Sequence, residues 1–404
     1  MRFNLWEDCN RVPLTELLSF IVDNRGKTVP TAPSGHKLIA TNCVTNNTLF
    51  PVYDKIRYLS EETYQTWFRA HPIPGDILFV NKGTPGRVCI VPDPVDFCIA
   101  QDMIALRADE SKIYPKYLFT VLRSREIQQQ IYNTNVGDVI PHFKKQFLDQ
   151  LLIPIPERSI QESIGDLYYV LSLKAERNKK INDNLQQQAA ALFESWFVNY
   201  DPWDGVQPSE WENAPLGSFV EIKRGGSPRP IQDFLSDSGL RWLKISDVTS
   251  LSSPFVLEIK EHIKEEGLRK TVFLHAGELV LSNSATPGIP KILDVDTCIH
   301  DGWLYFPKSE LSKYYLYLFF KHIRKELVAL GNGSVFTNLK TDILKAFPAT
   351  KADESTLKEF DALVTPLFDA MLNADRENFK LAAMRDALLP KLMSGEIDVS
   401  AIQL

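Results

Sequence analysis

The sequence predicts an α+β protein in which two similar mixed α/β blocks alternate with two long helices. Two observations lead to this prediction. Each block of about 150 residues is followed by a long apolar heptad pattern, and the landmarks of the first block recur in the same order in the second. The chain is therefore predicted to be a tandem duplication of block and helix.

The first long helix is predicted from Glu157 to about Val198, between Pro156 and Pro202. About forty helical residues make a rod roughly 60 Å long. Its apolar stripe is narrow, so it requires a partner helix rather than a broad core. The predicted seam consists of Ile160, Ile164, Leu167, Leu171, Asn178, Ile181, Leu185 and Leu192.

The partner helix is predicted near the C-terminus, where apolar residues again recur in steps of three and four. Its predicted seam consists of Leu357, Phe360, Val364, Leu367, Met371, Asn378, Leu381, Leu388 and Leu392. The two polar seam residues, Asn178 and Asn378, are interpreted as setting the register of the pair rather than binding a ligand.

The clearest part of the repeat is a stretch of twelve residues that aligns without a gap, Gly75–Gly86 with Gly277–Gly288. Five positions are identical: Gly75/Gly277, Asn81/Asn283, Thr84/Thr286, Pro85/Pro287 and Gly86/Gly288. Short β-rich runs separated by glycine and proline predict several strands in each block. One helix per block is expected, at 114–132 and at 312–330.

The bulk properties are those of a globular protein of two or more domains: 404 residues, 44% hydrophobic and 24% charged. No apolar run is long enough to span a bilayer, and the N-terminus does not resemble a signal peptide. The five cysteines form no Cys-x-x-Cys pair. We therefore expect reduced thiols, a cytoplasmic location and no structural metal.

The net charge of −6 is unevenly distributed. Residues 1–153 carry 17 basic against 16 acidic residues, and residues 204–350 carry 17 against 18. The helical segments are acidic, with 5 against 7 in 154–203 and 6 against 10 in 351–404. The blocks are thus near neutral, which permits a local basic face on each.

Catalytic motifs are scarce. The sequence has no nucleotide-binding glycine loop, no His-Glu-x-x-His and no Pro-Pro dipeptide, which the Asn/Asp-Pro-Pro-aromatic loop of base-amino methyltransferases requires. Asp76, Asp93, Asp102 and Asp301 lie near predicted strands and leave a cryptic nuclease as an alternative. Turn and capping roles are far commoner for such residues, so we expect a chain that is not itself an enzyme.

Polar glycine-containing loops recur at the same place in both blocks and are the best candidates for a binding site. Glycine lets main-chain N–H groups approach a phosphate, Ser and Thr donate to it, and Arg or Lys can reach guanine. Simple turns are the alternative interpretation. The candidate DNA-binding residues are Arg25, Lys27, Thr28, Asn81, Lys82, Thr84 and Arg87 in the first block and Lys223, Arg224, Ser227, Arg229, Asn283, Ser284, Thr286 and Lys291 in the second.

These motifs resemble the specificity (S) subunits of type I restriction–modification systems over nearly the whole chain. Trp211–Pro230 resembles the opening of a target recognition domain, and Gly277–Gly288 resembles its inner strand and loop. Ile153–Phe197 is similar to the central conserved region, and Leu388–Ile397 to the end of the distal one. The segment Asn24–Pro30 departs from the glycine-rich opening that Lys223–Pro230 matches.

The resemblance implies a non-catalytic DNA-binding subunit. Residues 1–153 and 204–350 would be target recognition domains, each reading half of a split sequence in double-stranded DNA. Residues 154–203 and 351–404 would form an antiparallel coiled coil that sets the gap between the halves. Two methyltransferase (M) subunits would dock on it, and restriction–translocase (R) subunits would join them. S-adenosylmethionine, ATP and Mg²⁺ would belong to those partners.

Two other functions fit the same residues. The chain could serve a methylation-only or phage-exclusion complex, or it could be a coiled-coil scaffold whose blocks bind protein. An aromatic group at the end of the first helix and just after it also has two interpretations, packing on the second block or docking of a partner, of which packing is favoured. It comprises Phe193, Trp196, Phe197, Tyr200 and Trp203.

Overall fold

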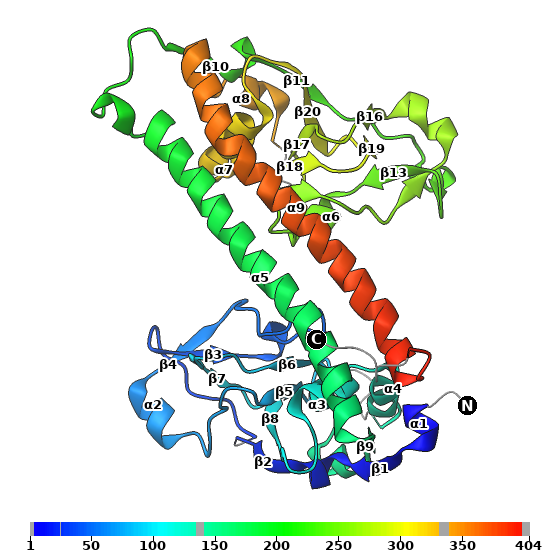
Figure 1. The fold of residues 1–404 in the computed structure, drawn as a ribbon. Coiled ribbons are helices and arrows are strands. Elements are labelled where there is room, and N and C mark those ends of the chain that lie inside the picture. The colour runs from blue at the N-terminus through cyan, green and yellow to red at the C-terminus, as the bar shows by residue number, and fades with distance from the viewer. Residues whose placement is uncertain (1–3, 25, 135–140, 331–338, 398–404) are drawn as a thin grey trace. The chain divides into compact units, whose positions relative to one another are not determined.

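The computed structural model describes residues 4–24, 26–134, 141–330 and 339–397. The chain divides into two compact units. Unit 1 consists of residues 1–177 and 378–404, and unit 2 of residues 178–377. Each long helix therefore contributes one half to each unit (Figure 1).

Unit 1 begins and ends its globular part in one two-stranded antiparallel sheet, in which β1 (Asn10–Pro13) pairs with β9 (Leu152–Ile155). A four-stranded antiparallel sheet has the order β2-β8-β5-β6, and a three-stranded sheet has the order β4-β3-β7 with β3 parallel to β7. The strands are β2 (Leu18–Val22), β3 (His36–Ile39), β4 (Arg57–Leu59), β5 (Ile77–Val80), β6 (Val88–Ile90), β7 (Phe97–Ile99) and β8 (Met103–Ala108).

The helices of this globular part are short: α1 (Leu5–Asp8), α2 (Glu61–Thr66), α3 (Pro115–Leu122) and α4 (Arg125–Asn133). The single helix expected at 114–132 is two helices. The hydroxyl of Ser124 accepts a hydrogen bond from the Ile127 N–H and caps a new helix, while the preceding Arg123 turns into the interior. The sequence pattern did not reveal this break because both halves are amphipathic.

Unit 2 repeats this plan with additional edge strands. Strand β10 (Glu212–Pro215) pairs with β21 (Pro348–Lys351), and two five-stranded sheets have the orders β11-β20-β17-β18-β14 and β12-β15-β13-β19-β16. Their strands are β11 (Val220–Arg224), β12 (Leu235–Ser236), β13 (Leu240–Leu243), β14 (Phe255–Val256), β15 (His262–Ile263), β16 (Val272–Leu274), β17 (Leu279–Ser282), β18 (Pro290–Leu293), β19 (Thr297–Ile299) and β20 (Trp303–Ser309). The helices are α6 (Ile245–Thr249), α7 (Lys313–Leu330) and α8 (Thr341–Lys345).

The strand pairing confirms the duplication. The order β2-β8-β5-β6 corresponds to β11-β20-β17-β18, and the parallel pair β3–β7 corresponds to β13–β19. In each unit, a buried tyrosine makes the same hydrogen bond to the main chain. Tyr117 donates its hydroxyl to the Pro154 carbonyl oxygen at 2.8 Å, and Tyr315 donates to the Thr350 carbonyl oxygen at 2.7 Å. Both acceptors lie on the strand that leads into a long helix.

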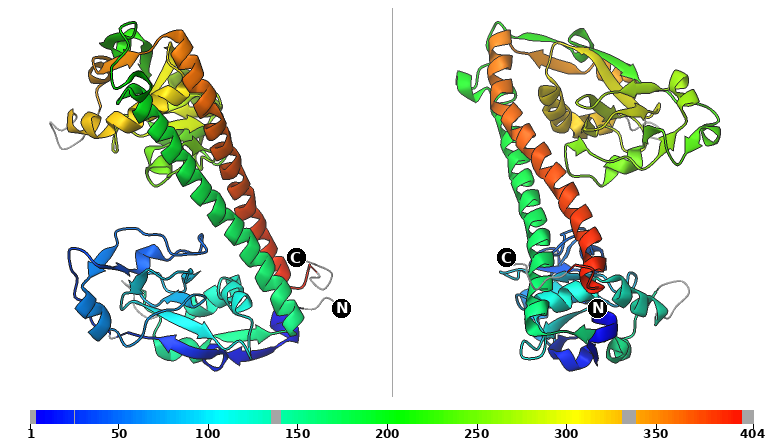
Figure 2. Two further views of the ribbon diagram at one scale, coloured as in Figure 1. Left: turned by 60° about the vertical axis from the view of Figure 1, so that its left-hand side comes forward. Right: turned by 45° about the vertical axis from the view of Figure 1, so that its right-hand side comes forward.

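The two long helices are α5 (Arg158–Phe197) and α9 (Glu354–Met393), each of 40 residues, and they pack antiparallel in both units (Figure 2). In unit 2, Asn178 donates to Glu377 at 2.7 Å, while Phe193 and Phe197 lie against Phe360. In unit 1, Ile164 and Tyr168 share a core with Leu389, Leu392 and Met393. Helix α9 continues through Pro366 and Pro390.

The predicted seam of α9 follows its buried face: Phe360, Val364, Met371 and Leu392 are buried, and Leu357, Leu367, Asn378, Leu381 and Leu388 are partly buried. On α5 the buried face is turned by about one residue from the prediction. Ile164 and Asn178 are buried, whereas Ile160, Leu167, Leu171, Leu185 and Leu192 are only partly buried.

Ile181 is the clearest error in the predicted seam, because its side chain is 50% exposed and Asn182 is buried in its place. The physical reason is that α5 packs on the globular part as well as on α9. Tyr168 lies against Phe119, and Phe193 lies against Tyr315. A heptad reading anticipates only the helix partner and misses this second contact.

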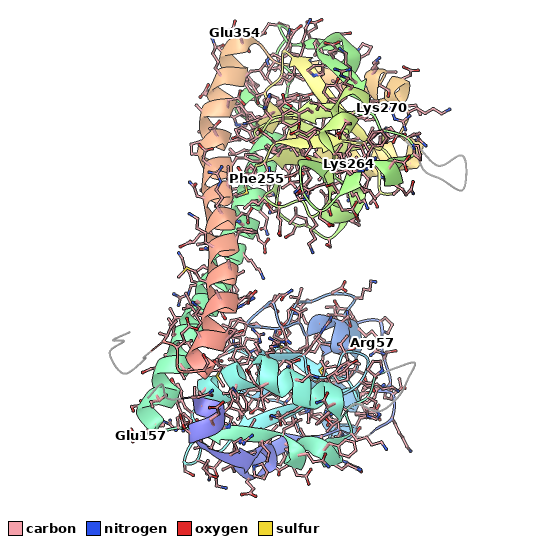
Figure 3. The ribbon with its side chains drawn as sticks, turned by 90° about the vertical axis from the view of Figure 1, so that its right-hand side faces the viewer. Arg57, Glu157, Phe255, Lys264, Lys270 and Glu354 are labelled. Carbon is pink, nitrogen blue, oxygen red and sulfur yellow. The ribbon has the colours of Figure 1, made fainter. Side chains whose placement is uncertain are left out.

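The aromatic group at the end of α5 and just after it packs on the second block, as favoured from the sequence. Phe197 stacks edge-on against Tyr315 at 4.9 Å between ring centroids, and Trp203 stacks edge-on against Trp211 at 4.8 Å. Phe255 of β14 extends the contact to α9, where its ring lies 6.3 Å from that of Phe368 (Figure 3). One buried cluster of unit 2 thus joins the β11-β20-β17-β18-β14 sheet, α7 and both long helices.

Replacing Phe360 with alanine should lower the free energy of unfolding of unit 2 by about 3–5 kcal/mol, because the ring is fully buried among Phe193, Phe197 and Tyr315. Chemical denaturation followed by tryptophan fluorescence measures the change. The matched control is Phe379→Ala on the same helix, where the ring is 50% exposed. Equal effects of the two substitutions would contradict the packing described here.

Candidate nucleic-acid interface

Three predicted residues of the second domain meet at one acidic side chain, Asp301. Arg224 donates from Nε to the main-chain oxygen of Asp301. Ser227 donates from its hydroxyl to Oδ1 at 2.6 Å, and Arg229 donates to Oδ2 at 3.1 Å. These contacts join the loop after β11 to the turn between β19 and β20. Arg224 and Arg229 remain exposed, so their cationic groups face solvent.

The local sequence explains why these loops lie so close. Gly225 follows β11, and a Cβ atom at this position would lie 2.3 Å from the main-chain oxygen of His300. Only glycine permits such an approach of two main chains. A second loop reaches the same place, because a Cβ atom on Gly302 would lie 2.5 Å from the hydroxyl of Ser284. The residues 224–229, 284–286 and 300–302 therefore form one loop cluster in unit 2.

A cleft of about 910 Å³ opens beside this loop cluster. Its wall includes Arg229, Trp242, Lys244, Ser284 and His300. The rings of Trp242 and His300 lie 5.9 Å apart between centroids. The two cations of the cleft pair with carboxylates in this structure, Arg229 with Asp301 and Lys244 with Glu261. With an aromatic ring and neutral hydrogen-bonding groups beside them, they are suited to a nucleotide, since bases stack on rings and phosphates can pair with Arg or Lys.

The charges of the cluster follow from its hydrogen bonds. The hydrogen bond from Ser227, with the nearby guanidinium groups of Arg224 and Arg229, lowers the pKa of Asp301 below its usual range. Burial lowers the pKa of His300. The Gly302 N–H donates to Nδ1 of His300 at 2.8 Å, so Nδ1 carries no proton in this arrangement. The remaining proton of the neutral ring is on Nε2, which makes Nε2 a hydrogen-bond donor.

Three other predicted residues of the second domain are placed differently. The ammonium group of Lys223 pairs with Glu221 at 2.9 Å rather than joining the cluster. Thr286 holds the turn through its main chain, donating its N–H to the Ser284 oxygen at 2.6 Å and accepting from the Ser282 hydroxyl at 2.6 Å. Lys291 is buried and lies elsewhere in the unit.

The corresponding loop of the first domain follows β5. Lys82 forms an isolated antiparallel bridge with His142, and the Gly83 N–H donates to the Pro141 oxygen at 2.9 Å. The side chains of Lys27, Thr28 and Lys82 are exposed, and those of Thr84 and Arg87 are partly buried. Arg25 lies outside the described residues, and no contact given by the structure joins Lys27 or Thr28 to the loop after β5.

The two loops have the same main-chain geometry. Gly83 and its counterpart Ala285 both have positive φ, +85° and +57°. Alanine adopts this conformation only at a cost of about 1–2 kcal/mol, so the tertiary structure holds the turn in place. The main-chain oxygen of Asn81 accepts from the Phe143 N–H at 2.8 Å, and that of Asn283 accepts from the Leu339 N–H at 2.7 Å.

Burial corrects three of the predicted DNA contacts. The side chains of Asn81, Asn283 and Lys291 are 3%, 2% and 3% exposed. Side chains that are covered by the domain cannot contact DNA without rearrangement. The two asparagines anchor the turns, and Lys291 donates to main-chain oxygens. These residues were singled out because their types bind DNA, and residue type carries no information on burial.

Sequence reasoning missed three residues beside the loop cluster. His300 and Lys244 line the cleft, and the main-chain oxygen of Lys270 lies 3.0 Å from the position of a Cβ on Gly226. Lys264 and Lys270, exposed at either end of the 265–270 turn, are labelled in Figure 3. The only signal available beforehand was that His300 follows Cys298-Ile299, a landmark repeated in the first block as Cys98-Ile99.

Comparison with known proteins bears directly on this arrangement. A family described as the type I restriction modification DNA specificity domain matches residues 19–187 and 208–350. The chain belongs to this family. Both matched segments contain one globular domain and its loops, so the specificity domain occurs twice in the chain.

The relatives are specificity subunits. The chain is 22% identical over 347 residues to the type I restriction enzyme MjaIX specificity subunit of Methanocaldococcus jannaschii, covering 81% of this chain and 79% of the relative. It is 23% identical over 401 residues to the HindI specificity subunit of Haemophilus influenzae, covering 80% and 86%. It also resembles the crystal structure of a type I restriction–modification S subunit from M. genitalium, with a TM-score of 0.63, 16% identity and coverage of 97% and 98%.

Membership in the specificity family establishes the general role of the chain, which is DNA target recognition by a non-catalytic subunit. Within the described residues, no three His, Cys, Asp or Glu side chains are arranged to hold a metal ion. The described part of the chain contains no helix that combines the length and apolar character needed to cross a membrane.

The stability of unit 2 should fall as the pH is lowered from about 6.5, because the folded state holds His300 unprotonated whereas the unfolded chain binds a proton at an ordinary pKa near 6.5. The slope from this one group reaches at most about 1.4 kcal/mol per pH unit. In His300→Asn, the amide oxygen can accept from Gly302 but does not titrate, so the variant should lose this part of the slope. Urea denaturation between pH 5 and 7.5 measures it, and identical slopes would contradict the assignment.

Proposed function

We propose that the chain reads a split sequence in double-stranded DNA, one half with each globular domain, and brings methyltransferase and restriction–translocase subunits to it. Residues 1–153 and 204–350 are the two target recognition domains in this proposal. Residues 154–203 and 351–404 supply the spacer helices and the tail. Membership in the specificity family gives DNA recognition, and the division of labour is our inference from the architecture.

The observation that carries the proposal is the duplication of the loop after the inner strand. The Asn-x-x-Thr-Pro-Gly turn follows β5 in the first domain and β17 in the second. The two turns share equivalent main-chain hydrogen bonds, from the Gly86 N–H to the Val80 oxygen and from the Gly288 N–H to the Ser282 oxygen. A protein with two equivalent reading loops fits a target with two parts. In the second domain, our candidates for DNA contacts are Arg224, exposed in the loop cluster, and Arg229 and Ser284, which are exposed and partly exposed in the wall of the cleft.

The spacing of the two half-sites is proposed to depend on the length of the helices. Helices α5 and α9 have 40 residues each, so each extends roughly 60 Å. One turn of B-DNA is about 34–36 Å. The helical length therefore corresponds to a gap of one to two turns at most.

Partner docking is proposed to involve the solvent-facing sides of the long helices. Large apolar side chains are exposed there: Val170, Ile181, Leu363, Phe379 and Met384 are 44–50% exposed. Exposed apolar residues on both helices are suited to packing against further helices. Two methyltransferase subunits would occupy these faces, with S-adenosylmethionine, ATP and Mg²⁺ bound by the partners rather than by this chain.

The decisive experiment is a methylation map of the host genome, with and without this gene, by single-molecule sequencing. Loss of one modified motif with two short halves around a fixed gap would support the proposal and reveal the target. An unchanged map, in a host where the partner subunits are expressed, would contradict it and favour a protein-binding scaffold.

Inserting one heptad into both helices, after Arg177 and after Glu377, should lengthen the recognised gap. Seven helical residues add about 10.5 Å, and a heptad nearly preserves the angular position of the seam. Methylation mapping of the variant measures the gap. Both half-sites should stay the same, and an unchanged gap would contradict the proposed ruler. An insertion in one helix alone serves as the control and should abolish recognition by misaligning the seam.

A further inference from the structure

In each unit, one loop of the globular domain lies against the long helices. We name residues 45–49 and 250–254 the docking loops. They are equivalent in the duplication, because a main-chain oxygen of each loop accepts a hydrogen bond from the corresponding strand, β6 in unit 1 and β18 in unit 2. The Leu49 oxygen accepts from the Ile90 N–H at 2.8 Å, and the Pro254 oxygen accepts from the Ile292 N–H at 2.9 Å.

The first docking loop is held from inside the domain by Arg123. This side chain, 7% exposed, donates to the main-chain oxygens of Thr45 at 3.3 Å and of Thr48. The same guanidinium donates to the Val88 oxygen at 2.8 Å and lies over the ring of Phe119. Arg123 therefore ties the loop to both β6 and α3.

Both long helices hold the other side of the first docking loop. The Leu49 N–H donates to Glu176 of α5 at 3.0 Å, and Arg385 of α9 reaches the Asn47 oxygen at 3.5 Å. The hydroxyl of Tyr168 on α5 accepts from Arg123 at 3.5 Å. The loop is thus fixed between a buried cation and the helix pair.

The second docking loop is held in the same manner by a different cation. Lys291 of β18 donates from Nζ to the main-chain oxygens of Leu251 at 2.6 Å and of Ser253. On the other side, the Ser253 hydroxyl donates to Asp375 of α9, and the same carboxylate accepts from Asn182 of α5 at 2.7 Å. Lysine and arginine come from different elements of the two domains but act on equivalent loops.

Stability does not account for these two cations. Burial lowers the pKa of both Arg123 and Lys291, the latter to about 7, so the surroundings disfavour the charge. Their hydrogen-bond partners in the docking loops are main-chain oxygens rather than carboxylates. Replacing a buried ion pair with apolar side chains of similar size is often neutral or stabilising, so the burial of a charge is weak evidence for a stabilising role. The remaining explanation is that these groups position the docking loops, because ammonium and guanidinium groups fix the positions of the carbonyls they bind.

We propose that Arg123 and Lys291 are positioning residues that fix the angle of each recognition domain on the helix pair, and through it the spacing of half-sites that the chain accepts. The inference rests on the proposed reading of a split target. The length of the helices would set the approximate gap, and the docking loops would restrict it to one value.

To restrict the gap to one value, the docking loops have to make the chain discriminate against a gap that is one base pair too long or too short. Adding one base pair to the gap moves one half-site by about 3.4 Å and turns it by about 35° relative to the other. A domain held rigidly cannot follow this turn, so it loses contacts and about tenfold in affinity, the usual effect of one faulty base-pair contact. A domain released from its docking loop can follow the turn.

The test uses the full chain assembled with its methyltransferase subunits and duplexes that carry the target found by methylation mapping. Three gaps are compared: the native one, and one base pair shorter or longer. Fluorescence anisotropy gives the dissociation constants. Wild type should prefer the native gap by at least about tenfold. Lys291→Met should bind the native gap within about threefold of wild type and prefer it by less than about threefold.

Four further measurements separate positioning from damage to the fold. Lys291→Met removes a buried charge but also the donor to the Leu251 and Ser253 oxygens, so it should cost no more than about 1–3 kcal/mol and remain folded at the assay temperature. Lys321→Met, which removes another cation of unit 2 whose pKa is lowered by burial, should keep the preference. Arg229→Ala should weaken binding at all three gaps alike, because its side chain belongs to the loop cluster. Arg123→Met should relax the preference as Lys291→Met does.

Unaltered gap preference in Lys291→Met, or an equal loss of affinity at all three gaps, would overturn the inference and leave the proposed function intact. Failure of the wild-type complex to bind the split target would overturn both. The two failures are therefore distinguishable from the wild-type measurement alone.

Discussion

The architecture depends on one requirement: the narrow apolar stripe of each 40-residue helix has to be buried against the other helix. Because the helices are nearly 200 residues apart in sequence and pack antiparallel, the beginning of α5 meets the end of α9. Unit 1 is consequently built from two distant pieces, with Leu389 and Leu392 completing a core that begins at Leu5. Both recognition domains take their place from this pairing, since each is packed on halves of both helices.

The two duplicated domains are more alike in how they are attached to the long helices than in their candidate DNA-binding loops. The sheet orders, the buried tyrosines and the docking loops are equivalent in both. The loop cluster around Asp301 has no equivalent carboxylate in the first domain, where Gln101 occupies the corresponding place. Such a division suits the proposed reading of a split target, in which both domains need the same attachment and the sequence read would differ between them.

Much of the fold could be predicted from the sequence because it rests on periodic patterns. The heptads predicted the first helix to within about a residue at each end and the second to within about three, and the repeated Gly75–Gly86 stretch predicted the duplication. The face of α5 could not be predicted, because Tyr168 and Phe193 pack on the domains as well as on α9. The site was predicted less well, since burial of Asn81, Asn283 and Lys291 depends on contacts distant in sequence. His300 was missed because a lone histidine carries no spacing signal.

The discontinuity of unit 1 has a consequence for synthesis on the ribosome. A chain grows from its N-terminus at about 5–20 residues per second. Unit 2 is continuous and has all its residues once position 377 has emerged, whereas the core of unit 1 lacks Leu389, Leu392 and Met393 until the last turns of α9 follow. The half of the protein that is made first is therefore the last that can finish folding, and until then its unfilled apolar surface is open to premature association or to chaperones.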